Sequence, residues 1–254
     1  MINQQLYDTI FKRKSVRKYD MNPLSETILN EVKAFANSAL PLVPELKYTY
    51  TYLSAGDIKN LLPIKAPHYL CLYSETKDHY LMNAGYLLQQ IDLFLSERGL
   101  GSCWLGMAKP NKQVVAQQDG LEFVIMLAFG MPAEPVHRTS VGEFKRKPVE
   151  AITRMGGEVP ELLEAVRLAP SASNSQPWIV GGTPSAITVS REKLNLIRGA
   201  LYNKMNQIDI GIALLHLELA IRRQGGQPVY DFAAADGTTG GEFMAKVEVK
   251  PIDE

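Results

Sequence analysis

Two prolines bracket the segment that most constrains this chain, residues 169–178, which read Ala-Pro-Ser-Ala-Ser-Asn-Ser-Gln-Pro-Trp. Pro170 ends the helix predicted before it, and Pro177 fixes the exit of the backbone. Small hydroxyls and amides between the prolines suit neither a core strand nor a helix interior. We therefore expect a stiff polar loop, anchored by Trp178, that presents neutral hydrogen-bonding groups to a flat ligand with a polar edge. The alternative is a Ser/Asn-rich surface turn.

The composition is that of a globular chain with balanced charge. Its 254 residues suffice for one large domain or two small ones, and 46% of them are apolar. Basic and acidic residues number 27 each, which removes the electrostatic argument for a nucleic-acid or membrane partner. No apolar run approaches the roughly 20 residues of a membrane helix, and the first residues lack the pattern of a secretory signal. We therefore expect a cytoplasmic protein.

The residue types that bind metals or form disulfides are few and scattered. Cys71 and Cys103 are too far apart in sequence for a disulfide framework or a CxxC metal site. The histidines form no HxxxH or HxH spacing. We expect two buried free thiols in a reducing cytoplasm and no metal site.

Hydrophobic periodicity predicts helices interspersed with short strands. Ser25 is the expected N-cap of one helix, and Gly99 is the expected residue after the end of another. The predicted helices span residues 3–12, 25–36, 80–98, 160–169 and 206–223. The predicted strands span residues 47–53, 67–73, 102–108, 121–129, 179–180, 186–189 and 242–249. The polar segment 133–154 is interpreted as a crossing connection.

Two parts of this pattern resemble each other. Residues 30–39 can be laid over residues 163–172, and residues 85–99 over residues 211–225, at offsets of 133 and 126. The order of the elements is kept and only the loops differ in length. This predicts an internal duplication. The alternative is that pairs of amphipathic helices align by chance.

A short basic motif near the N-terminus could hold a phosphate. Arg13, Lys14, Ser15 and Arg17 place three cations and a hydroxyl within five residues. An Arg side chain offers a bidentate fork to phosphate oxygens, and Ser adds a short donor. The alternative is a solvated basic run. A second basic group at residues 145–147 could complete the same pocket or could simply be exposed.

The glycine-rich segment Gly99-Leu-Gly-Ser-Cys-Trp-Leu-Gly106 fits neither common nucleotide fingerprint. A P-loop requires Lys followed by Ser or Thr after its last glycine, where this chain has Met107-Ala108. A dinucleotide fingerprint lies between a strand and a helix, whereas here a helix precedes the glycines. The glycines instead allow bare backbone N–H groups to approach a ligand closely. No catalytic triad, nucleophile elbow or paired-carboxylate motif stands out, so a cofactor would have to supply the chemistry.

Three segments resemble motifs of the FMN-dependent nitroreductase family. Residues 13–19 resemble its R-[R/x]-S-x-R-x-[F/Y] opening, residues 99–104 its G-L-G-S-x-W turn, and residues 169–178 its A-P-S-x-x-N-x-Q-P-W motif. With their flanking helices they cover most of residues 8–230. The resemblance implies an α+β fold with a central, mostly antiparallel sheet flanked by helices. It also implies one FMN held at an interface and NAD(P)H-driven reduction of nitroaromatics or quinones.

The chain departs from this family in the placing of its motifs. In the ordinary family the A-P-S motif follows the basic motif within a few tens of residues, where this chain has Ala36-Asn-Ser-Ala-Leu-Pro41. The first half, residues 1–150, keeps the basic motif, and the second half, residues 151–254, keeps the A-P-S loop. The resemblance therefore implies a fused pseudo-dimer, similar to a divergent tandem subgroup, with both halves in one compact unit and one surviving site. A monomer and a homodimer both stay open.

The family's roles carry over to matching positions of the first half. Arg13 and Ser15 would bind the FMN phosphate, with Lys14 alongside. Arg17 would lie near the N1/O2 edge of the flavin, where the reduced ring gathers negative charge.

The remaining roles fall on the glycine turn and on the second half. Leu100 and Gly101 would offer backbone N–H groups near the flavin N5 or O4. The flavin ring would be lined by Pro170, Ser171, Ser173 and Asn174. Arg146 or Lys147 would add a further phosphate contact.

The predicted activity is an oxidoreductase that uses FMN and a small-molecule acceptor. Hydride would pass from NADH or NADPH to the flavin N5, and the acceptor would then take the place of the nicotinamide in a ping-pong route. The alternative is a module that binds flavin or another small ligand without turnover. The sequence names neither the acceptor nor the preferred nucleotide.

Overall fold

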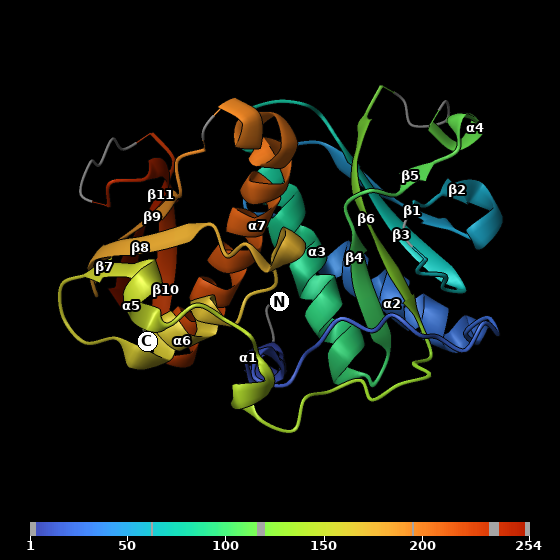
Figure 1. The fold of residues 1–254 in the computed structure, drawn as a ribbon, viewed down its shortest axis with the longest axis horizontal. Coiled ribbons are helices and arrows are strands. Elements are labelled where there is room, and N and C mark those ends of the chain that lie inside the picture. The colour runs from blue at the N-terminus through green and yellow to red at the C-terminus, as the bar shows by residue number, and fades with distance from the viewer. Residues whose placement is uncertain (1–3, 62, 116–119, 195, 234–238, 252–254) are drawn as a thin grey trace. The chain divides into compact units, whose positions relative to one another are not determined.

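The computed structural model describes residues 4–61, 63–115, 120–194, 196–233 and 239–251. The chain divides into two compact units, Met1–Val141 and Gly142–Glu254 (Figure 1). Each unit contains helices and a largely antiparallel sheet, which confirms the predicted α+β class. Within the described ranges, none of the helices combines the length and the apolar character needed to cross a membrane.

Unit 1 (Met1–Val141) is built on a four-stranded antiparallel sheet with the order β1-β3-β6-β4. Its strands are β1 (Tyr48–Leu53), β3 (His68–Ser74), β4 (Gly101–Leu105) and β6 (Glu122–Gly130). Its helices are α1 (Gln4–Ile10), α2 (Glu26–Ser38) and α3 (Tyr80–Glu97). α3 packs against β3, β4 and β6, while α1 and α2 pack against α3. β3 lies between β1 and β6, and its side chains are buried from Tyr69 onward, as expected for a central strand.

The basic segment that follows α1 is attached to the core of unit 1. One cluster of buried side chains contains Cys71 and Cys103 from the sheet, together with Val16 and Tyr19 from this segment. Both thiols are buried and unpaired, as predicted. Burial raises the pKa of both, to about 12 for Cys71, so neither thiol is an activated nucleophile. Unit 1 also contains η1 (Ala55–Asp57), β2 (Ile58–Lys59), β5 (Lys109–Pro110) and α4 (Lys112–Val115).

Unit 2 (Gly142–Glu254) is built on a five-stranded sheet with the order β10-β11-β9-β8-β7. Its strands are β7 (Thr153–Met155), β8 (Trp178–Thr183), β9 (Ala186–Arg191), β10 (Gly226–Asp231) and β11 (Glu242–Pro251). β7 runs parallel to β8, and the other neighbours are antiparallel. Its helices are α5 (Val149–Ile152), α6 (Pro160–Arg167), η3 (Ala172–Asn174) and α7 (Leu196–Arg223), and η2 (Val141–Glu143) lies at the boundary.

The structure corrects three predictions about unit 2. The connection expected over residues 133–154 contains α5 and the start of β7. α7 begins at Leu196, ten residues before its predicted start at 206. β10 was not predicted because Pro228 interrupts its pattern, but β10 is an edge strand, where the missing proline N–H is tolerated.

The two units share one topology. Unit 1 follows the order α2-β1-β3-α3-β4-β6, and unit 2 follows α6-β8-β9-α7-β10-β11. The sheet orders β1-β3-β6-β4 and β8-β9-β11-β10 correspond strand for strand. Both last strands carry a bulge at the same place, with Val124 following Glu122-Phe123 and Met244 following Glu242-Phe243 as the unpaired residues.

Candidate functional site

The basic segment, residues 12–18, is tied to two other parts of unit 1. The Val16 N–H donates to the Ser102 carbonyl on β4 at 2.9 Å. Arg13 forms an isolated antiparallel bridge with His137. The protein itself therefore fixes the backbone of this segment on both sides.

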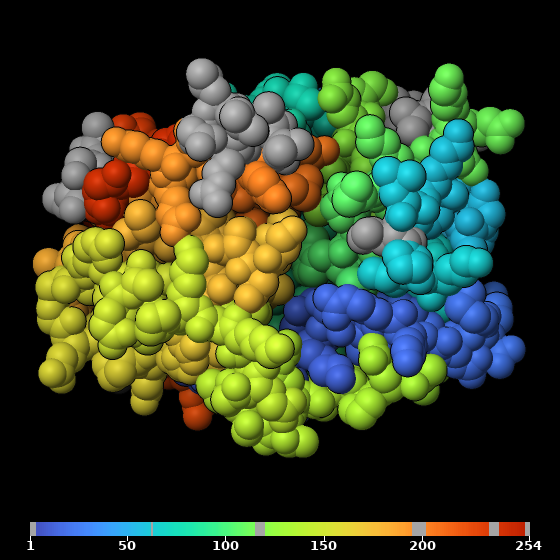
Figure 2. Space-filling model, in the orientation of Figure 1, coloured from blue at the N-terminus to red at the C-terminus, as the bar shows by residue number. Residues whose placement is uncertain are grey.

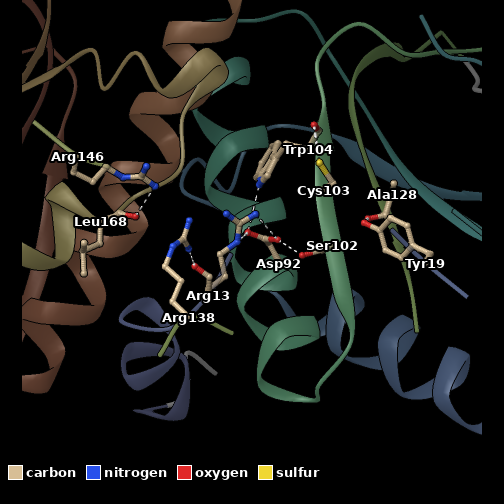
Figure 3. Close-up of polar contacts among 10 residues, drawn as sticks. All are labelled: Arg13, Tyr19, Asp92, Ser102, Cys103, Trp104, Ala128, Arg138, Arg146 and Leu168. Atoms are coloured by element: carbon tan, nitrogen blue, oxygen red, sulfur yellow. Dashed lines mark hydrogen bonds and ion pairs between the residues drawn. The ribbon is translucent and has the colours of Figure 1, made fainter. Parts of the chain in front are cut away.

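Arg13 is engaged by a buried carboxylate that the sequence analysis did not single out (Figure 3). Its Nε lies 2.7 Å from Asp92 Oδ2, and its Nη2 donates to Oδ1 at 3.1 Å. The Ser102 hydroxyl also donates to Oδ1, and the Trp104 indole N–H donates to Oδ2 at 3.4 Å. The Arg13 and Asp92 side chains are 5% and 0% exposed. The basic motif and the glycine turn thus meet at one carboxylate of α3.

The geometry of this ion pair leaves part of the Arg13 guanidinium for another anion. A guanidinium has five N–H groups; here Nη2 donates one hydrogen to Asp92, and Nε lies within ion-pair distance of the same carboxylate. The Nη1 end is the edge that could also bind a phosphate. Asp92 lies within the apolar run Ile91-Asp-Leu-Phe-Leu95, and a charge in so apolar a helix is a signal that could have identified it from sequence.

The other predicted phosphate ligands differ in exposure. Lys14 and Ser15 are half-buried, and Arg17 is exposed. The Arg17 N–H donates to Glu134 Oε1 at 2.6 Å, and this bond lowers the pKa of Glu134. An ionised carboxylate therefore lies beside the Arg17 backbone and offsets part of the positive charge of the segment.

The glycine turn ends α3 in a Schellman motif. Gly99 has a φ of 73°, and its N–H donates to the Ser96 carbonyl at 3.1 Å. The Leu100 N–H donates to the Leu95 carbonyl at 2.8 Å. The end of α3 therefore already uses the Leu100 N–H that was predicted to face the flavin. Gly101 begins β4 and pairs with Gly130 on β6.

Gly101 is required by protein packing. A Cβ at this position would lie 2.7 Å from Val16 Cγ1 and 3.1 Å from the Tyr19 ring. Tyr19 donates its hydroxyl to the Val16 carbonyl at 2.7 Å, and burial keeps its pKa well above the ordinary value. The close approach expected between the glycine turn and a ligand is thus made here by the basic segment itself.

The polar loop of unit 2 has an unusual backbone. Ser173, Asn174 and Gln176 have φ values of 52°, 55° and 49°, in the left-handed region that disfavours side chains. Trp178 is fully buried at the start of β8, so it anchors the loop as predicted. Such conformations persist only where surrounding contacts over-determine them.

Two basic residues supply several of those contacts. Arg146 donates to the Asn174 side-chain oxygen and, at 3.2 Å, to the Leu168 carbonyl. The Lys147 ammonium donates to the Gln176 carbonyl at 3.1 Å and pairs with Glu192 at 2.6 Å. The sequence predicted Arg146 or Lys147 as a phosphate contact, whereas the structure has both bracing the loop, with the Lys147 charge already paired.

The loop side chains predicted to line a flavin are also partly engaged within the loop. Ser171 Oγ accepts the Gln176 N–H at 2.9 Å, and Asn174 donates to the Lys145 carbonyl at 2.6 Å. Pro170 is buried and Ser173 is exposed. In Figure 2 the part of the chain from α5 to η3, coloured yellow-green to gold, forms much of the surface of unit 2 on the face shown. Ser173 is therefore the hydroxyl of this set best placed to meet a ligand.

A second buried acid holds the same loop. Asp209 on α7 is 3% exposed, and its two carboxyl oxygens lie 3.0 Å and 3.2 Å from the Ala172 N–H that donates to them. Burial raises the pKa of Asp209 from 3.8 to about 8, against the opposing effect of that N–H. No motif in the sequence marks Asp209 as part of this loop's support.

These features define a class. Two α+β units with antiparallel sheets, a basic motif joined to a glycine turn, and a strained A-P-S loop are typical of nitroreductase-like proteins. Residues 5–221 match the model of the family described as "Putative TM nitroreductase". Because the match covers more than half of the chain, the chain belongs to this family.

One solved structure, with a TM-score above 0.5, supports this assignment of the fold. A putative nitroreductase from Thermotoga maritima has 23% sequence identity over 97% of this chain and 94% of its own, with a TM-score of 0.66. A nitroreductase family protein from Clostridium novyi NT has 20% identity over 51% of this chain and 86% of its own, with a TM-score of 0.43. An FMN-dependent nitroreductase from Clostridium difficile R20291 has 16% identity over 56% and 99%, with a TM-score of 0.43. No curated protein matches the chain.

Proposed function

We propose that this chain is an FMN-dependent oxidoreductase that passes hydride from NADH or NADPH to a nitroaromatic, quinone or similar acceptor by a ping-pong route. The observation that carries the proposal is the junction at Asp92, where the basic motif and the glycine turn meet around Arg13. Membership of a nitroreductase family supports the same class of chemistry. FMN, when bound, supplies the hydride-accepting atom, which leaves position and electrostatics to the protein.

The donor set of unit 1 fits the phosphate of FMN. Arg13 offers its Nη1 end, and the half-buried Lys14 and Ser15 add an ammonium and a hydroxyl. These are the groups that bind a dianionic phosphate with charge-assisted hydrogen bonds. Arg17 is proposed for the N1/O2 edge, where its cation would stabilise negative charge on a reduced ring.

The groups proposed to meet the flavin ring are fewer than the sequence predicted. Leu100 and Gly101 stay proposed as the positions of the glycine turn nearest the ring, and Ser173 is the exposed hydroxyl of the A-P-S loop. Pro170, Ser171 and Asn174 are proposed to shape the loop around the ring, because the Ser171 and Asn174 side chains are engaged with neighbouring backbone groups.

The shared topology of the units supports the proposal of an internal duplication. Strand order and bulge position coincide, and each unit keeps a motif that the other lacks. We therefore propose a fused pseudo-dimer that binds one FMN per chain, for which a second copy is not required. Solution mass would distinguish a monomer from a homodimer, and fractionation would test the proposed cytoplasmic location.

Absorption spectroscopy of the purified chain tests the proposed activity. The flavin visible band should be present, or should appear with a gain in thermal stability when FMN is added. NADH or NADPH should bleach that band rapidly, and a quinone should restore it. Slow or absent bleaching would favour a flavin-binding module without turnover, and absence of FMN binding would contradict both.

Arg13→Ala tests the phosphate assignment. We expect FMN binding to weaken by roughly 1.5–3 kcal/mol, the scale of a lost charge-assisted hydrogen bond. Calorimetric titration measures the change, with Ser185→Ala, on the surface turn between β8 and β9, as a control outside the site. Unchanged FMN affinity in folded Arg13→Ala would assign the phosphate elsewhere.

A further inference from the structure

Asp209 is the buried acid of unit 2 whose contact reaches the strained loop directly. The Ala172 N–H that it accepts immediately precedes Ser173 and Asn174, the residues with positive φ. η3, which contains all three loop residues, packs against α7. The acid therefore acts on the backbone at the point where the loop is least favourable by itself.

Unit 1 uses the corresponding position of its long helix in the same way. The offset of 126 residues that aligns α3 with α7 pairs Asn83 with Asp209. Asn83 Oδ1 accepts the Val43 N–H at 3.1 Å, in the segment that follows α2. A neutral amide thus holds one segment and a carboxyl holds the other. An amide is sufficient to accept a backbone N–H. The carboxyl at Asp209 differs from it because it can gain or lose a proton.

We propose that Asp209 is a positioning residue that holds residues 170–177 in their ligand-binding conformation while protonated, and that loss of its proton releases the loop. This inference rests on the proposed flavin function. Asn206, one turn earlier on α7, has a buried Oδ1 without a donor among the described residues. Residues three apart on a helix are neighbours, so a protonated Asp209 is suited to donate to it. Ionisation would remove that donor and leave a charge in a buried position.

Burial, and not a neighbouring charge, determines whether Asp209 is protonated. Among the residues whose side chains are described, the charged groups on α7 and on the elements packed against it are Glu161, Glu164, Arg167, Arg191, Asp231, Lys204, His216, Glu218, Arg222 and Arg223. Glu164 pairs with Arg167, Arg191 with Glu242, and Glu218 with Arg222. Burial raises the pKa of Asp209 and outweighs the Ala172 N–H, which lowers it, so the buried position favours the protonated acid.

Three variants separate the acceptor from the proton. Asp209→Asn keeps an acceptor for the Ala172 N–H and cannot titrate, whereas Asp209→Leu removes the acceptor and keeps the branching of the side chain. Asn83→Leu removes the matching acceptor in unit 1 and is the control for loss of a buried polar group. FMN dissociation constants are measured for the full-length chain and each variant between pH 6 and 9. Hydrogen exchange of the peptide covering residues 168–177 is measured without FMN over the same range, corrected for intrinsic rates.

We expect the wild-type FMN dissociation constant to rise at least tenfold relative to Asp209→Asn as the pH increases through 8, with loop protection falling in parallel. Asp209→Leu should bind FMN about tenfold more weakly than Asp209→Asn at pH 6, where Asn83→Leu should follow the wild type. Identical pH profiles for wild type and Asp209→Asn, in both measurements, would overturn the proposal. If Asp209→Leu does not fold, that comparison still decides it. Absence of FMN binding by wild type, with the expected exchange pattern, would instead reject the proposed function and keep the hold of Asp209 on the loop.

Discussion

The segments that follow α2 and α6 are held by matching positions of two long helices, yet only the second segment is strained. In unit 1, Gln90 of α3 exchanges hydrogen bonds with the Leu40 backbone. In unit 2, the matching His216 of α7 bonds to the Ala165 carbonyl inside α6, and Asp209 of α7 accepts the Ala172 N–H beyond it. Among the described non-glycine residues, three of the four positive φ values fall in the unit 2 loop and none in residues 39–47. In both units the long helix provides the hydrogen-bonding partner, and the sequence of the segment that it binds determines whether the backbone of that segment is strained.

A second pair of matching positions on α3 and α7 carries a buried carboxylate in each unit, but the two carboxylates have partners at different distances along the sequence. Asp92 of α3 and Glu218 of α7 match at the same offset, and both are buried. Asp92 binds Arg13, which is 79 residues away in sequence. Glu218 binds Arg222 on the next turn and accepts the Tyr230 hydroxyl at 2.8 Å. Unit 2 has no basic motif to offer, so its carboxylate is satisfied locally.

The largest expected effects come from removing Asp92 or Glu218, because the two losses in the free energy of unfolding should differ. Asp92→Ala should lower the free energy of unfolding by about 3–5 kcal/mol, because it leaves the buried Arg13 charge unpaired. Glu218→Ala should lower it by about 1–3 kcal/mol, because the Arg222 side chain is 38% exposed and can be hydrated. Urea unfolding measures both. The double variant Arg13→Leu/Asp92→Leu should be less destabilised than either single variant. Equal losses for Asp92→Ala and Glu218→Ala would contradict the inferred difference between a buried and a partly hydrated partner.

The acid at Asp209 should make stability depend on pH. Its folded pKa of about 8 lies above its ordinary value of 3.8, so the folded chain retains a proton that the unfolded chain has lost. Stability is therefore full below the ordinary value and falls as the pH rises toward 8. Asp209→Asn should be more stable than wild type by a few kcal/mol at pH 8.5, and this advantage should vanish near pH 3.5.

A reciprocal exchange in unit 1 checks the same reasoning. Asn83→Asp places a carboxyl at a position that is 1% exposed, so it should introduce a loss of stability with rising pH. Urea unfolding across the pH range measures both variants. Parallel stability profiles for wild type and Asp209→Asn would show that the acid is ionised in the folded chain.

Gly101→Ala tests the contact between the basic segment and the glycine turn. The added methyl would meet Val16, so we expect a loss of about 1–3 kcal/mol in the free energy of unfolding. Val16→Ala should recover part of that loss in the double variant. Gly99→Ala is the matched control, because its φ of 73° is unfavourable but a Cβ there would meet nothing within 4 Å. Recovery of Gly99→Ala by Val16→Ala would argue against a local clash.

The smallest effect is expected from Lys147→Met. Its ammonium is partly exposed and paired with Glu192, so stability should change by less than about 1 kcal/mol. FMN affinity should change less than twofold, because the structure places this charge on the loop and on Glu192. A tenfold loss of FMN affinity with unchanged stability would restore Lys147 as a phosphate ligand.

Periodic elements could be predicted from sequence, because local patterning decides them. Ser25 caps α2 and Gly99 ends α3 as predicted. The apolar surroundings of Asp92 could have marked it in the sequence, but its pairing with Arg13 could not be predicted, because the two residues are distant in sequence and meet only in the fold. The bracing roles of Arg146 and Lys147 escaped for the same reason, since basic residues in a polar connection are as consistent with solvent as with a loop 28 or 29 residues away. Motif resemblance supplied the residues proposed for the site, and tertiary contacts show which of their atoms are already engaged within the protein.

Equilibrium titration of the purified chain with FMN tests the central claim most directly. The ratio of bound FMN to chain is measured from flavin absorbance, with the solution mass determined on the same sample. One FMN per chain is the predicted result, because the basic motif survives in unit 1 and the A-P-S loop in unit 2. No bound FMN would contradict the flavin function, and two FMN per chain would contradict a single surviving site.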